Sequence, residues 1–127
     1  MARSRLGSRN LVAFVATAAP AKAKKFYRDT LGLRLVDENP FALVFDANGT
    51  MLRVTQVETV AVAGYTVLGW QVPDIADMVT RLKKAGVRFQ RYDGMWQDKL
   101  GIWQSPSGAK VAWFKDPDGN TLSVTQH

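Results

Sequence analysis

The chain has 127 residues, of which 46% are hydrophobic, and this size fits one domain with a single core. Its 17 basic and 11 acidic side chains give a net charge of +6, but Arg3, Arg5 and Arg9 supply half of that excess. A basic tail that we expect to be disordered over residues 1–9 therefore explains much of the charge, and we expect no nucleic-acid partner. The absence of cysteine excludes disulfides, thiolate nucleophiles and cysteine-based zinc sites.

No apolar run in the sequence is long enough to span a bilayer. The first ten residues are polar and contain arginine, and no hydrophobic segment with a cleavage site follows them. We therefore expect a cytoplasmic protein without a membrane partner.

The first half of the chain contains one helix signal among several strand signals. Pro20 begins a stretch in which Ala23, Tyr27 and Leu31 recur at helical spacing, and Gly32 is suited to end it. β-rich apolar segments separated by turn residues predict strands over Leu11–Thr17, Leu33–Val36, Ala42–Asp46 and Thr50–Val57. This half is thus predicted to be β-α-β-β-β.

The second half repeats the same order. Pro73 and Asp74 begin a predicted helix with one apolar face, and Gly86 ends it. Strands are predicted over Tyr65–Val72, Val87–Arg91, Gly101–Gln104, Lys110–Phe114 and Thr121–Thr125. The helix-ending and turn glycines are farther apart here than in the first half, which indicates an insertion of about 16 residues near residues 92–107.

This duplication predicts an α+β fold made of paired βαβββ units, about residues 10–58 and 64–127, within one domain over 10–127. One amphipathic helix per unit would cover one face of the sheet. The other face of a curved mixed sheet would then be free to form a cleft, which is the expected binding site.

Two motifs resemble those of a known family. The helix end Phe26–Leu33 and the turn Phe114–Leu122, which contains Asp-Pro-Asp-Gly-Asn, are similar to signatures of the vicinal oxygen chelate superfamily of glyoxalases, bleomycin resistance proteins and extradiol dioxygenases. The resemblance covers about residues 11–125 and implies the paired βαβββ fold. It also implies a homodimer, and it leaves the activity open because this family shares a scaffold rather than a reaction.

Enzymes of that superfamily hold a metal with His, Glu or Gln on the first and last strands of each unit. The resemblance places these positions at Val12, Arg53, Val67 and Ser123, and none of these residues is a good metal ligand. The composition of the chain also argues against a metal site, because the chain has only one histidine, His127, and only two glutamates. Backbone bonding within the turn explains Asp116 and Asp118. We therefore expect no metal and no other cofactor, although a site made from Gln71 or Gln126 with aspartates stays open.

Arg53 is the most informative candidate for ligand binding. If it lies in the cleft wall, its guanidinium would repel a metal and attract a carboxylate, phosphate or polarised carbonyl. A register shifted by one residue would instead place Arg53 on the outer face or pair it with an aspartate. Met51 and Ser123 are expected to line the cleft, and Gln71 to offer a hydrogen bond into it.

The four tryptophans divide into two predicted groups. Trp70 and Trp113 fall within strands and are expected in the core. Trp96 and Trp103 lie in or near the insertion and are candidates to stack on a flat or apolar ligand, with a dimer contact as the alternative.

The sequence therefore favours a metal-independent protein that binds an apolar or aromatic small molecule. The enzyme alternative is a glyoxalase-like lyase or isomerase, or a dioxygenase, with unusual metal ligands or with metal-free chemistry supported by Arg53. A Ser–His nucleophile would require the terminal His127 to fold back into the cleft. A third hypothesis is an interaction module without a ligand.

Overall fold

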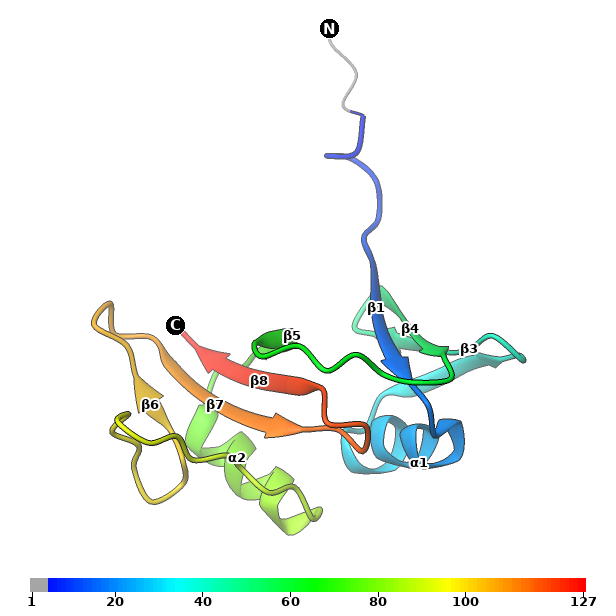
Figure 1. The fold of residues 1–127 in the computed structure, drawn as a ribbon. Coiled ribbons are helices and arrows are strands. Elements are labelled where there is room, and N and C mark those ends of the chain that lie inside the picture. Colours follow the sequence, from blue (N-terminus) through cyan, green and yellow to red (C-terminus); the bar gives the residue numbers. More distant parts are fainter. Residues whose placement is uncertain (1–4) are drawn as a thin grey trace, which may run out of the picture.

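The computed structural model describes residues 5–127, which form two βαβββ units (Figure 1). In the first unit the elements are β1 (Val12–Thr17), α1 (Pro20–Lys25), η1 (Phe26–Thr30), β2 (Arg34–Glu38), β3 (Ala42–Ala47) and β4 (Thr50–Gln56). In the second they are β5 (Thr66–Gln71), α2 (Ile75–Lys84), β6 (Trp103–Gln104), β7 (Lys110–Lys115) and β8 (Thr121–Gln126). The predicted α+β fold with duplicated units is confirmed. None of the helices is long and apolar enough to cross a membrane, as far as residues 5–127 show.

Each unit forms its own four-stranded mixed sheet. Sheet A has the order β1-β4-β3-β2 and sheet B the order β5-β8-β7-β6, and in both the first strand runs parallel to its neighbour. The strands β1 and β5 are therefore free edges in this chain. In Figure 1 both helices lie on the same side of the sheets, and we call the opposite side the open face.

The core lies between the sheets and the helices. Side chains alternate between the two faces of each sheet, and those on the helix side are buried. They include Val15, Phe45 and Val54 in sheet A and Ala112 and Phe114 in sheet B. These residues belong to one cluster that crosses both units. The two units consequently share a core although their sheets are separate.

The helix of the first unit changes its winding half-way. Pro20 begins α1 with the fixed φ that suits a first helical turn. The next five residues form the π-helix η1, in which the Leu31 N–H bonds the Phe26 carbonyl at 2.9 Å. This winding brings both Phe26 and Tyr27 onto the core, where they meet Phe114 and Phe45.

The turn after β7 fastens the second unit to the first (Figure 1). Asp116 accepts the backbone N–H groups of Asp118 and Asn120, as the sequence predicted for a self-bonded turn. Its other oxygen accepts the Tyr27 hydroxyl at 2.7 Å and the Asn120 amide at 2.9 Å. Asp118 in turn accepts the Thr17 hydroxyl and, at 2.9 Å, the Ala18 N–H. These aspartates are thus structural, and they link the units.

One predicted strand is wrong. Over Val87–Arg91 only Phe89 makes an isolated bridge, to Phe114. The Val87 N–H is used at the end of α2, where it bonds the Leu82 carbonyl. Arg91 donates to the carbonyls of Asp98 and Lys99, so the chain turns into the inserted loop before a ladder can form.

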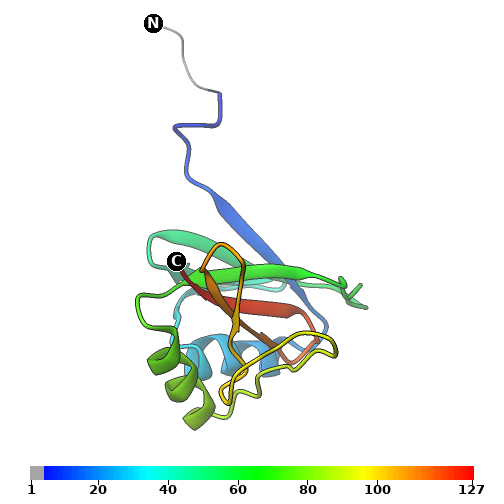
Figure 2. The same cartoon turned by 90° about the vertical axis from the view of Figure 1, so that its left-hand side faces the viewer.

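The expected tail over residues 1–9 falls partly outside the described residues. Residues 5–9 are exposed, and the Arg9 N–H bonds the Leu6 carbonyl at 3.0 Å. In both Figure 1 and Figure 2 this segment leads away from the domain in line with β1.

Candidate functional site

Arg53 lies at the centre of the open face of sheet A. Its neighbours across the strands are Phe14 on β1 and Val44 on β3, so an apolar side chain stands on each side. Arg53 is half-buried, and none of the four ion pairs among residues 5–127 includes it. The register therefore places Arg53 on the open face, and within residues 5–127 it forms no ion pair with an aspartate. Its predicted place in a cleft wall stays a prediction.

Met51 lies two residues from Arg53 on the same face. It stands between Val12 on β1 and Asp46 on β3 and is 43% exposed. A cavity of about 340 Å³ opens beside it, bounded by Val36 and by Arg34, which pairs with Asp46 at 3.5 Å. The open face of sheet A thus contains a recess lined by apolar side chains and by the Arg34–Asp46 ion pair.

An aromatic cluster occupies the open face of sheet B. The ring centroid of Trp113 lies 6.0 Å from that of Trp103 and 5.6 Å from that of Tyr92. The Trp113 indole N–H donates to the Thr66 hydroxyl at 3.1 Å, which fixes the ring. The expectation that Trp113 is a core residue was wrong, because β7 places Ala112 and Phe114 inward and Trp113 on the other face. Trp70 does pack, half-buried, against the core.

Ser123 lies beside this aromatic cluster. It pairs across the strands with Trp113 on one side and Gly69 on the other. A Cβ at residue 69 would come 2.7 Å from the Ser123 hydroxyl, so only glycine leaves this arrangement unstrained. The glycine leaves room for the hydroxyl of Ser123, which is itself buried.

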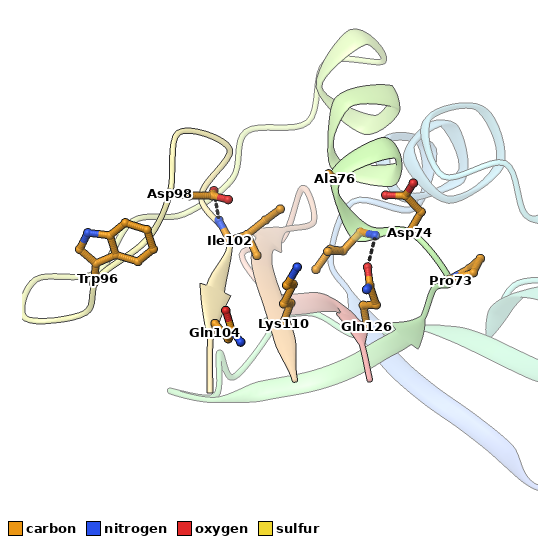
Figure 3. Close-up of a pocket in the computed structure, with 10 residues that line it drawn as sticks. Pro73, Asp74, Ala76, Trp96, Asp98, Ile102, Gln104, Lys110 and Gln126 are labelled. Atoms are coloured by element: carbon orange, nitrogen blue, oxygen red, sulfur yellow. Dashed lines mark hydrogen bonds between the residues drawn. The ribbon is translucent and has the colours of Figure 1, made fainter. Parts of the chain in front are cut away.

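The remaining predicted site residues lie elsewhere. Gln71 is exposed at the end of β5, beside His127. Trp96 is 76% exposed and borders a different cavity, between the inserted loop and the start of α2 (Figure 3). The structure therefore places Arg53 and Met51 on one sheet, Ser123 and Trp103 on the other, and Trp96 apart from both.

Comparison with known proteins identifies the family. Residues 10–124 match the model of the Glyoxalase/Bleomycin resistance protein/Dioxygenase superfamily. The chain belongs to this superfamily. A search of curated protein sequences finds no significant match.

Solved structures of this superfamily have the same fold. A glyoxalase/bleomycin resistance protein/dioxygenase from Alicyclobacillus acidocaldarius is 17% identical with a TM-score of 0.70, over 98% of this chain and 95% of that one. Lactoylglutathione lyase from Agrobacterium tumefaciens is 19% identical with a TM-score of 0.69, over 94% and 93%. TioX from Micromonospora sp. ML1 is 21% identical with a TM-score of 0.70, over 94% and 99%. At these identities the likeness extends to the fold alone.

The four positions at which glyoxalase-type enzymes hold a metal do not fit one here. Val12 and Val67 offer no donor atom, and a guanidinium at Arg53 repels a cation. Ser123 alone carries a side-chain oxygen. Within residues 5–127 no group of three or more His, Asp or Glu side chains could hold a metal ion.

Sequence reasoning missed three open-face residues, namely Phe14, Tyr92 and Trp113. The alternation of β1 predicted two faces but did not say which one faces solvent, and Phe14 is 62% exposed. A Trp flanked by Ala112 and Phe114 carries no signal of its side, because all three residues are apolar.

Proposed function

We propose that this superfamily member binds a small organic molecule on the open faces of its sheets without a metal ion. The ligand has an apolar or aromatic body and an anionic or carbonyl end. A cytoplasmic location belongs to the same proposal, and cell fractionation tests it.

The observation that carries this proposal is the environment of Arg53. Arg53 is half-buried between Phe14 and Val44, and no carboxylate of residues 5–127 pairs with its guanidinium. A ligand carboxylate or polarised carbonyl would supply the missing acceptor with charge-assisted hydrogen bonds.

The aromatic cluster of sheet B supports an apolar or aromatic body for the ligand. Trp103, Trp113 and Tyr92 offer ring faces and edges next to the Ser123 hydroxyl. Aromatic pairs contribute about 0.5–1.5 kcal/mol beyond the burial of their area, so a planar ligand would gain from this cluster.

The two halves of this site belong to separate sheets, which leads us to propose a homodimer. Large apolar side chains are exposed on both open faces, including Phe14 and Met51 on sheet A and Val67 on sheet B. Soluble proteins seldom leave such patches uncovered. A second copy would cover them and bring the aromatic cluster of one chain to Arg53 of the other. Light scattering coupled to gel filtration tests this part, and a monomer at micromolar concentration would refute it.

A fluorescence titration tests ligand binding. Aromatic carboxylates are compared with their uncharged primary amides, with tryptophan emission as the signal. We expect the carboxylates to bind at least about tenfold more tightly, since a hydrogen bond to a charged group contributes roughly 1.5–3 kcal/mol. Arg53→Gln should remove this preference, and Arg81→Gln, at an exposed residue of α2 on the helix side of the sheets, should keep it.

Three outcomes would contradict the proposal. An unchanged preference in Arg53→Gln would show that another residue recognises the anion. A lack of any fluorescence response across the panel would favour an interaction module. Stoichiometric, tightly bound Fe, Zn, Ni or Mn in the purified protein would favour a glyoxalase-like lyase, isomerase or dioxygenase.

A further inference from the structure

A second cavity lies on the helix side of sheet B, away from the open face (Figure 3). Its volume of about 490 Å³ is within the range of small-molecule sites. Its floor is the last row of the sheet, where Gln104, Lys110 and Gln126 are direct neighbours on β6, β7 and β8. The helix α2 begins beyond this row and leaves it uncovered.

This floor is a row of hydrogen-bond donors. In Figure 3 the Lys110 side chain rises between the two glutamines into the cavity. Lys110 is half-buried and takes part in none of the four ion pairs among residues 5–127. The Gln126 carbonyl oxygen accepts the Ile75 N–H at 2.9 Å, which orients its amide and leaves the NH₂ group available. An ammonium flanked by amides is suited to bind a carboxylate.

The walls of the cavity carry negative charge, opposite to the Lys110 ammonium of the floor. One oxygen of Asp98 accepts the N–H groups of Leu100 and Ile102, both at 2.9 Å, and one oxygen of Asp74 accepts the Asp77 N–H at 3.1 Å. The second oxygen of each carboxylate makes no hydrogen bond within residues 5–127. Two carboxylates with free oxygens are suited to bind an ammonium group.

The remaining wall is apolar. Ile75 and Ile102 line the cavity. In Figure 3 Ile102 lies next to Asp98, and the Trp96 ring stands at the outer rim. The start of α2 is not itself an anion site, since Asp74 and Gln126 already occupy two of its first N–H groups.

We propose that this cavity binds a small zwitterion of the α-amino acid type. Its carboxylate bonds Lys110 and Gln126, its ammonium lies between Asp74 and Asp98, and an apolar side chain lies against Ile75 and Ile102. This site is independent of the open-face site, which Arg53 defines.

Four probes with the same side chain test the proposal in the full-length protein. They are L-phenylalanine, its N-acetyl derivative, its amide, and the N-acetyl amide, which lacks both charges. Affinity is measured by amide chemical shifts in NMR titrations. We expect the free amino acid to bind at least about tenfold more tightly than each singly blocked form, with the largest shifts at Ile75 and Ile102.

Matched variants locate the charges. Lys110→Met should weaken the free amino acid at least about tenfold, while Lys115→Met, on the same strand outside the cavity, should not. Asp98→Asn can still accept the same two backbone N–H groups, and it should weaken the preference for a free ammonium, to which Asp74 still contributes. The proposal would be overturned by equal affinity for the blocked and free forms, or by shifts confined to the open face. It would also be overturned if no probe caused a shift at about 10 mM, which is roughly tenfold above the upper end of typical KM values.

Discussion

Replacing Tyr27 by Phe removes a single atom from the link between the two units. The Tyr27 side chain is fully buried, and its hydroxyl donates to Asp116 at 2.7 Å. Asp116 keeps three donors in the variant, two backbone N–H groups and the Asn120 amide. The loss is therefore one hydrogen bond to a buried carboxylate, worth about 1.5–3 kcal/mol. For a domain of this size that lowers Tm by roughly 5–15 °C.

The same hydroxyl makes the stability of the fold depend on pH. Burial, followed by the charge of Asp116 and the hydrogen bond to it, raises the pKa of Tyr27 far above its ordinary value of 10.0. The unfolded chain releases this proton near pH 10, whereas the folded chain retains it. The stability contributed by Tyr27 is therefore complete below pH 10 and falls as the pH rises above it, by about 1.4 kcal/mol at pH 11.

Urea denaturation of both proteins at pH 7 and pH 11 tests this reasoning. The wild type should exceed Tyr27→Phe by about 1.5–3 kcal/mol at pH 7, and the difference should shrink by about 1.4 kcal/mol at pH 11. Tyr65→Phe, at a residue that is 72% exposed, serves as the control and should change stability by less than about 0.5 kcal/mol. A difference that is the same at both pH values, or one below about 0.5 kcal/mol at pH 7, would refute the assigned role of this bond.

Three further predictions concern separate features. Gly69→Ala should destabilise the protein by about 1–3 kcal/mol because its Cβ would meet the Ser123 hydroxyl, and adding Ser123→Ala should recover most of the loss in the same denaturation assay. Asp74→Ala removes the cap of α2 and should cost about 1 kcal/mol, more than Asp77→Ala, and equal losses would contradict the capping role. Treatment with EDTA followed by desalting should leave the affinity for aromatic carboxylates unchanged, and a loss that added metal restores would refute metal-independent binding.

Local signals predicted most of the fold. Pro20 and the Asp74 cap mark helix starts, and Asn48 with Gly49 adopts the positive φ values of 51° and 93° that a tight hairpin turn needs. These features depend on residues within a few positions of one another, so they can be recognised in a linear sequence. The strand predicted over Val87–Arg91 failed because a ladder also needs a partner, and the inserted loop draws the chain away first.

The candidate site was only partly predictable. The resemblance implied the position of Arg53 through the turn at Gly49, and the register shifted by one residue was an open alternative until the structure showed the pairing of β3 with β4. The open-face position of Trp113 and the row formed by Gln104, Lys110 and Gln126 could not be predicted in this way. They depend on which face of sheet B the helix α2 covers and on the residue at which α2 begins.

The amino-acid sequence by itself determined the duplicated β-α-β-β-β order, the hairpin turns and the unsuitability of Val12 and Arg53 as metal ligands, because spacing and side-chain chemistry decide these properties locally. Tertiary structure alone decided that Asp116 binds Tyr27, 89 positions away, that the open faces lie on two separate sheets, and that the end of sheet B carries a second cavity. The physical reason is that burial and long-range hydrogen bonds depend on how the two units pack. The residue pattern of one unit does not predict where the other unit lies against it.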